Sequence, residues 1–182
     1  MGILGELREG AFRLLVNHVL ALPVLPYSQR WRLLRALGFP VEPSLINAGV
    51  WFGGRNITIG AGSGINMGVV FDNMAPITIG RDVYIGHEVM VITSTHEHGT
   101  DGRAAGRAVG KPVTIEDGAW IGARAILLPG VTVGAGCTVA AGSVVRRNCA
   151  PGGIYAGTPA RLVRRPESRN RPSAGADTVS AA

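Results

Sequence analysis

An aliphatic residue returns at every sixth position between residues 113 and 145, and this period constrains the fold more than any other feature of the chain. The series consists of Ile115, Ile121, Leu127, Val133, Val139 and Val145. A small or aliphatic residue also stands two places before each of them, so the two side chains point the same way, as in a short β-strand. A period of six fits neither an α-helix nor one long alternating strand. It is typical of a coil of short strands, in which three sixes close a triangular turn of about 18 residues and successive turns stack roughly 4.8 Å apart.

The same period extends towards the N-terminus, with two interruptions. Its members there are Ile59, Ile65, Phe71, Ile79, Ile85 and Val91. The phase slips by two residues after Phe71, which predicts a bulge or small loop near Asp72 and Asn73. Between Val91 and Val113 the pattern stops but the phase is kept, and the intervening residues are glycine-rich and charged. We expect this segment to leave the coil as an exposed loop, the natural place for chemistry on so regular a scaffold.

A chain of 182 residues is long enough for one domain with appendages. We divide it into an N-terminal helical segment (1–45), a β-helix domain (46–165) with the loop at about 94–112, and a tail (166–182). The tail is polar and built of small residues, so we expect it to be disordered.

The N-terminal segment reads as two helices. Residues 3–22 form an amphipathic pattern that Pro23 and Pro26 end, and Ser28 can cap a second helix over residues 29–38. The expected packing stripe of the first helix consists of Leu4, Leu7, Ala11, Leu14 and Leu15. We expect both helices to cover the end of the coil or a neighbouring subunit. Trp31 with its flanking arginines leaves a membrane-surface contact open.

Charge and cysteine content narrow the class of protein. The formal net charge of +6 favours anionic partners, but the basic C-terminal third contains a single aromatic residue, Tyr155, and no interleaved aromatic series, so nucleic acid is not expected. Cys137 falls at an inward position of the repeat, which predicts a buried thiol rather than a disulfide. A reducing, cytoplasmic location is the default, and no segment reaches the roughly 18 apolar residues of a membrane span.

Three features together resemble the hexapeptide-repeat acyltransferases. They are the six-residue repeats, the sequence THEHG at 95–99 and the ending GIYAGTPARLVRR at 153–165. The galactoside, maltose and nodulation-factor O-acetyltransferases are the most similar, over roughly residues 50–165. The resemblance implies a mainly β fold, the left-handed parallel β-helix, although parallel crossovers are otherwise right-handed. It also implies a homotrimer with sites between subunits, and an acetyl-CoA-dependent O-acetyltransferase acting on a sugar or sugar-containing acceptor without a metal.

The resemblance assigns roles to individual residues. His96 matches the family's general base, and a histidine can take a hydroxyl proton and return it to a leaving thiolate. His98 is the alternative base. Asn66 and Asp72 resemble the residues that bind the acceptor's hydroxyl groups, although the segment between them is one residue shorter here. Asp72 with Asn73 can equally be a turn pair.

For the coenzyme, the resemblance points to small residues and to a basic cap. Ala123 and Ala141 match positions that contact the pantetheine arm, and Trp120 is interpreted as a packing residue on the wall of the prism or of the trimer. The basic cap over the nucleotide consists of Arg146, Arg147, Arg161 and Arg164. Guanidinium groups bind phosphates by paired hydrogen bonds. We interpret His18 and His87 as structural.

Two other classes of function remain as alternatives. A metal-dependent, carbonic-anhydrase-like enzyme would need converging ligands, and His87, His96 and His98 lack the paired spacing of such sites. A non-catalytic trimeric scaffold would not require a histidine-bearing loop beside a basic terminus. The identity of the acceptor, and the acyl group beyond an acetyl-like one, do not follow from the sequence.

Overall fold

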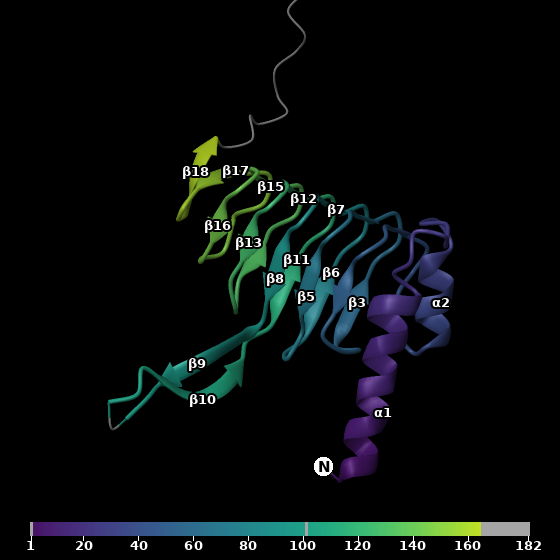
Figure 1. Cartoon of the computed structure of the whole chain (residues 1–182). Coiled ribbons are helices and arrows are strands. Elements are labelled where there is room, and N and C mark those ends of the chain that lie inside the picture. The colour runs from purple at the N-terminus through teal and green to yellow at the C-terminus, as the bar shows by residue number, and fades with distance from the viewer. Residues whose placement is uncertain (1, 101, 165–182) are drawn as a thin grey trace, which may run out of the picture.

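The computed structural model describes residues 2–100 and 102–164; the predicted tail at 166–182 lies outside the described residues. Short parallel strands stack into three sheets, which form the three faces of a prism (Figure 1). The first face contains β1 (Leu45–Ile46), β4 (Gly64–Ile65), β7 (Tyr84–Ile85), β12 (Trp120–Ile121), β15 (Thr138–Val139), β17 (Ile154–Gly157) and β18 (Ala160–Arg164). The second contains β2 (Trp51–Phe52), β5 (Val70–Asp72), β8 (Met90–Ile92), β13 (Ile126–Leu127) and β16 (Val144–Val145). The third contains β3 (Ile57–Ile59), β6 (Ile77–Ile79), β11 (Val113–Ile115) and β14 (Thr132–Val133).

The residues that recur with the predicted period of six form the core of this prism. Every residue of the two series named above is no more than 2% exposed. Residues of one column stand in register, as Ile65, Ile85 and Ile121 do on the first face. Full burial of one such side chain contributes about 1.5–3 kcal/mol, so the stack supplies the main driving force for folding. The parallel β-helix expected from the sequence is confirmed.

The phase slip after Phe71 is a loop at residues 73–76, between β5 and β6. Asn73 is buried there, and its Nδ2 donates a hydrogen bond of 2.7 Å to the carbonyl oxygen of Gly54. Thr93 supports the loop from the next coil, because its hydroxyl oxygen accepts a hydrogen bond of 2.9 Å from the amide of Ala75. The two extra residues therefore lie on the edge between the second and third faces and leave the core period intact.

The segment between Val91 and Val113 leaves the prism at the same edge, between the second and third faces. Its two arms are paired: β9 (Ser94–His98) and β10 (Ala105–Gly110) form an antiparallel hairpin. Figure 1 shows this hairpin projecting well away from the stacked coils. The sequence predicted an exposed loop but not its strand pairing.

The N-terminal helices differ from the prediction in length, in packing face and in cap. α1 (Ile3–Leu14) continues as the π-helical turn η1 (Leu15–Val19), and α2 spans Arg30–Ala36. Phe12 and Val16 are the buried residues, whereas Leu7 and Leu14 of the predicted stripe are 64% and 61% exposed. Leu7 and Leu14 do not pack on the prism of their own chain, because the helical segment has apolar residues on two sides and the side with Phe12 and Val16 meets the prism. Contact of the predicted stripe with a neighbouring subunit stays a prediction. The predicted Ser28 cap is wrong: Gln29 precedes α2 and forms no side-chain capping bond.

Aromatic rings join this segment to the first coils. All four phenylalanines form one chain of contacts, with ring centroids 5.7 Å apart for Phe12 and Phe39, 5.3 Å for Phe39 and Phe52, and 5.5 Å for Phe52 and Phe71. The helices thus cover the open end of the core, as one reading of the sequence expected. No helix in the described part of the chain combines the length and apolar character that crossing a bilayer requires.

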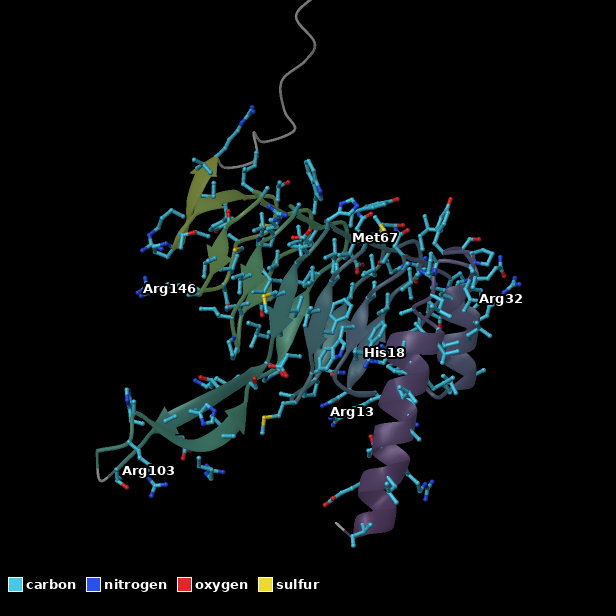
Figure 2. The ribbon with its side chains drawn as sticks, viewed as in Figure 1. Arg13, His18, Arg32, Met67, Arg103 and Arg146 are labelled. Atoms are coloured by element: carbon cyan, nitrogen blue, oxygen red, sulfur yellow. The ribbon has the colours of Figure 1, made fainter. Side chains whose placement is uncertain are left out.

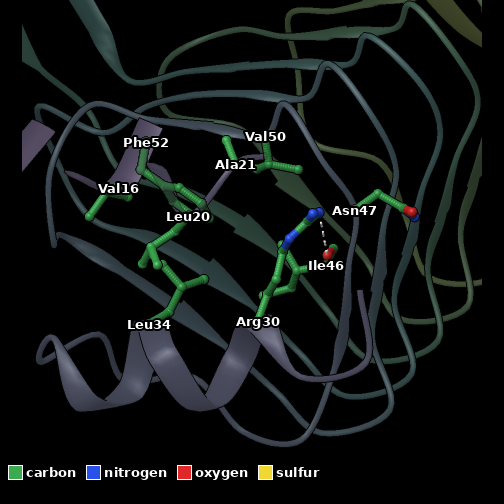
Figure 3. Close-up of a pocket in the computed structure, with 9 residues that line it drawn as sticks. All are labelled: Val16, Leu20, Ala21, Arg30, Leu34, Ile46, Asn47, Val50 and Phe52. Carbon is green, nitrogen blue, oxygen red and sulfur yellow. Dashed lines mark hydrogen bonds between the residues drawn. The ribbon is translucent and has the colours of Figure 1, made fainter. Parts of the chain in front are cut away.

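Arg30 holds the segment between η1 and α2 (residues 20–29) against the end of the prism that the helices cover (Figure 3). Its guanidinium is buried and donates hydrogen bonds to the carbonyl oxygens of Leu22, Leu25 and Ile46. Burial lowers the pKa of Arg30 from its ordinary value, because the charged form loses water. Arg30 therefore serves the end cap and is not available as a surface charge for a membrane.

Candidate active site

His96 lies in the middle of β9, on the projecting hairpin. Its side chain is exposed, and its Nδ1 is 2.9 Å from the carbonyl oxygen of Gly106 on the opposite strand. A carbonyl oxygen can only accept a hydrogen bond, so Nδ1 carries the proton in this contact. The neutral ring then presents an unprotonated Nε2, which is the form a general base needs.

The rest of the hairpin is held by pairing between its strands. Glu97 and Arg107 form an ion pair with contacts of 2.6 and 3.2 Å. His98 is exposed and stands opposite Ala105 in the register. Unlike His96, His98 is at the end of its strand, one position before Gly99. This placement favours His96 as the better positioned imidazole of the two.

Asp72 lies at the root of the hairpin, at the end of β5. The hydroxyl of Ser94 donates a hydrogen bond to Asp72 Oδ2, and the hydroxyl of Thr93 donates one of 2.7 Å to the Asp72 carbonyl oxygen. Asp72 is half-buried. The sequence paired Asp72 with Asn66 at one acceptor site; in a single chain one oxygen of its carboxylate is bonded to the hairpin.

A groove of about 530 Å³ runs along a different edge of the prism, between the first and second faces. Ala123 and Ala141 line it, together with Trp120, His87 and Asn66. Successive coils approach closely here: a Cβ added to Gly86 would be 2.6 Å from the amide nitrogen of Ala123. Small residues keep the groove open, and its lining is mainly apolar, so it suits a thin flexible chain.

Two residues that the sequence analysis interpreted as structural border this groove. Trp120 is 59% exposed and faces the groove from the wall of the prism. Its exposure follows from strand alternation, because Ile121 beside it is buried. His87, interpreted as structural, is exposed and borders the same groove. Asn66 also borders it, and its Nδ2 donates a hydrogen bond of 3.1 Å to the carbonyl oxygen of Ile85.

The four arginines of the predicted basic cap lie in three different places. Arg161 lies on β18 next to the turn at residues 157–160. This turn is held at the edge between the first and second faces, because the amide of Gly157 donates a hydrogen bond of 3.1 Å to the hydroxyl of Ser143. Arg164 stands at the other end of β18, opposite Ile154. Arg146 and Arg147 follow β16 at the hairpin edge, and Figure 2 shows Arg146 pointing outward.

One chain therefore carries the expected site in two halves. The edge between the first and second faces holds Asn66, Ala123, Ala141 and Arg161, and the edge between the second and third faces holds Asp72, His96, Arg146 and Arg147. The whole width of the second face separates these two edges. The members of each half lie along one edge of the prism on different coils, and a single chain does not bring the two halves together.

The second face between these edges has an apolar outer surface. Its outward residues form one register-aligned column of Trp51, Val70, Met90, Ile126 and Val144. The corresponding column of the third face consists of threonines at positions 58, 78, 114 and 132. An apolar sheet face beside a hydroxyl-lined one is typical of a surface that meets another protein.

The two cysteines lie inside the last coils as free thiols, as predicted for Cys137. The hydrogen bond with Cys149 is the main cause that raises the pKa of Cys137, and burial raises it further. The same hydrogen bond lowers the pKa of Cys149. Both lie away from the hairpin and the groove. Among the described residues, no three His, Cys, Asp or Glu side chains form a group that could hold a metal ion.

Comparison with known proteins agrees with this architecture. Residues 112–147 match the family described as bacterial transferase hexapeptide (six repeats). A hexapeptide-repeat acetyltransferase of Vibrio cholerae, solved in complex with acetyl coenzyme A, is 36% identical with a TM-score of 0.74, covering 88% of this chain and 86% of that one.

The chain belongs to the hexapeptide-repeat transferase family. Among curated members, the galactoside O-acetyltransferase of Lactococcus lactis is 34% identical over 63% of this chain and 55% of its own length. Nodulation protein L of Rhizobium meliloti is 44% identical over 60% of each chain. The chain thus spans little more than half the length of these curated relatives.

Proposed function

We propose that this hexapeptide-repeat protein transfers an acetyl or related acyl group from acyl-CoA to a hydroxyl group of a sugar or sugar-containing acceptor. The observation that carries the proposal is the contact of His96 Nδ1 with the carbonyl oxygen of Gly106. This contact orients the ring and leaves Nε2 to act as the base. Relatives that are named acetyltransferases, one of them solved with acetyl coenzyme A, support the reaction class.

In the proposed mechanism, His96 moves one proton twice. Nε2 takes the proton of the acceptor hydroxyl as its oxygen attacks the thioester carbon, and the resulting imidazolium returns that proton to the departing thiolate. The Gly106 carbonyl keeps the ring in one orientation and stabilises its positive charge in between.

The groove between the first and second faces is the proposed binding site of the coenzyme. Ala123 and Ala141 allow the pantetheine arm to approach the backbone, and Trp120 offers an apolar wall. Arg161, at the upper end of this edge, is suited to bind the phosphates. Asn66 lies in the same groove and is the remaining candidate for a contact with the acceptor.

A complete site requires a second copy of the chain, and we propose a homotrimer. The two half-sites flank the apolar second face, so packing this face near a three-fold axis would bring the hairpin edge of one copy to the groove edge of the next. The exposed position of His96 on a projecting hairpin agrees with this arrangement. With two free thiols, the protein suits a reducing compartment, and we place the reaction in the cytoplasm.

The test is acyl transfer by the purified full chain. Acetyl-CoA is supplied with maltose, with a nitrophenyl galactoside, or with water alone, and release of the coenzyme thiol is followed. His96→Ala should lower turnover by about two to four orders of magnitude while keeping the thermal shift caused by acetyl-CoA. His98→Ala is the matched control and should change turnover by less than about threefold.

Two results would contradict the proposal. A large loss in His98→Ala with a small loss in His96→Ala would move the base to His98. The absence of any thermal shift or calorimetric signal with millimolar acetyl-CoA would instead favour the non-catalytic scaffold.

A further inference from the structure

Asp72 and Ser94 connect the projecting hairpin to the rigid prism. Asp72 ends β5 in one coil, and Ser94 begins β9 after the next coil, so their side chains join two segments 22 positions apart. From this contact we infer that Asp72 and Ser94 are positioning residues for His96, and that Asp72 acts through the hairpin rather than by binding the acceptor. This inference rests on the proposed role of His96 as the base.

The root of the hairpin is already fixed on its backbone side. Thr93 is fully buried; its hydroxyl donates to the Asp72 carbonyl oxygen and accepts from the Ala75 amide. Its carbonyl oxygen accepts a hydrogen bond of 2.8 Å from the amide of Lys111, where the hairpin returns. Thr93 and Lys111 therefore fix where the hairpin leaves and rejoins the prism, but these contacts involve no side chain of β9.

Ser94 supplies the missing constraint. It is the next residue, half-buried, and its hydroxyl bonds to a carboxylate oxygen of Asp72. Hydrogen bonds to a charged acceptor are about twice as strong as neutral ones. With Thr93 and Ser94 both bound to the end of β5, the first residues of β9 cannot pivot about their attachment point.

The constraint reaches His96 through strand geometry. Side chains two positions apart point to the same side of a strand, so Ser94 and His96 share one side of β9. Ser94 is opposite Gly110 and His96 is opposite Ala108, and the imidazole is tied to Gly106. The chain of contacts thus runs from Asp72 through Ser94 and the paired strands to the ring. A misplacement of about 1 Å at the reacting atoms can lower a rate about 100-fold, so this geometry matters for catalysis.

Three variants test the inference with the full chain, acetyl-CoA and the galactoside probe. Ser94→Ala should lower kcat by about 5- to 30-fold and leave the KM for acetyl-CoA within about twofold. Ser94→Thr keeps the hydroxyl and should recover most of the rate. Asp72→Asn keeps an oxygen acceptor and should lie between wild type and Ser94→Ala.

The decisive measurement is the double variant Ser94→Ala/His96→Ala. If Ser94 acts only through the imidazole, its loss should have no further effect once the imidazole is gone. Hydrogen exchange of the β9 and β10 amides should also become faster in Ser94→Ala, while exchange in the stacked coils is unchanged.

Specific outcomes would overturn the inference. Multiplying losses in the double variant would show that Ser94 works independently of His96, and unchanged hairpin exchange in Ser94→Ala would remove the mechanical link. A raised KM for the galactoside with unchanged kcat in Asp72→Asn would return Asp72 to acceptor binding. A fully active His96→Ala would refute the proposed base, whereas an inactive His96→Ala beside a fully active Ser94→Ala would refute only the positioning role.

Discussion

Glu88 and Arg124 occupy the same corner of two neighbouring coils, and their side chains form an ion pair with contacts of 2.8 and 3.4 Å. Hydrogen bonds from Arg124, with its charge, lower the pKa of Glu88. Both residues have a left-handed backbone, with φ of 57° and 59°, at a corner where the coils before and after have glycine. An exposed ion pair of this kind stabilises little, so the backbone conformation dominates the energetics of the corner.

Gly142 allows a direct test of this corner geometry. Its φ is 69°, and an added Cβ would have no atom within 4 Å, so Gly142→Ala introduces backbone strain without a clash. We expect the free energy of unfolding to fall by about 1–2 kcal/mol, measured by urea denaturation. Gly54→Ala is the matched control: the added Cβ is equally free there, and φ is ordinary, so stability should be unchanged or slightly higher. Equal effects of the two variants would contradict this account.

The core could be predicted from the sequence because it repeats. Six-residue spacing places Ile65, Ile85 and Ile121 in one column regardless of loop content, so two interruptions did not obscure it. The packing face of α1 could not be found in the same way. Leu7 and Leu14 form as good an apolar stripe as Phe12 and Val16, and only the position of the prism decides between the two.

The candidate site was predicted in its parts and not in its arrangement. The resemblance grouped Asn66 and Asp72 as acceptor-binding residues, and in one chain they lie at different edges of the prism. Their grouping stays a prediction for a site shared between copies. No pattern in the sequence predicts the hydrogen bond between Ser94 and Asp72, because this bond depends on how the hairpin leaves the coil. Exposure of Trp120 was recoverable, since it alternates with buried Ile121.

Arg161 should affect binding of the coenzyme at the groove. If Arg161 binds the phosphates, Arg161→Ala should raise the KM for acetyl-CoA by about 5- to 50-fold with less effect on kcat. The charge-matched Arg161→Lys should recover part of the loss, because a lysine keeps the charge but not the paired donors. Steady-state kinetics at constant ionic strength provide the measurement, and an unchanged KM in Arg161→Ala would remove this residue from the site.

Met90 tests whether the second face packs against another copy. It is 38% exposed in the middle of the apolar column, and a buried, unpaired carboxylate in an interface is strongly unfavourable. Met90→Glu should therefore convert the oligomer to monomers, as measured by light scattering during size-exclusion chromatography. Thr78→Glu places the same charge on the third face and should leave the assembly intact. A monomeric wild-type protein, or an oligomer that tolerates Met90→Glu, would contradict the proposed packing.

A site shared between copies can be tested by mixing two inactive proteins. His96→Ala removes the base at one edge, and Ala141→Trp fills the groove at the other edge with a side chain at an exposed position. If each site combines the hairpin of one copy with the groove of the next, mixed oligomers contain some sites with neither change. Random exchange of equal amounts should restore about one quarter of the wild-type rate, since each half is intact with even odds. A site built within one chain would give no recovery, because every chain carries one of the two defects. Refolding the two variants together and separately, and then measuring thiol release, distinguishes these outcomes.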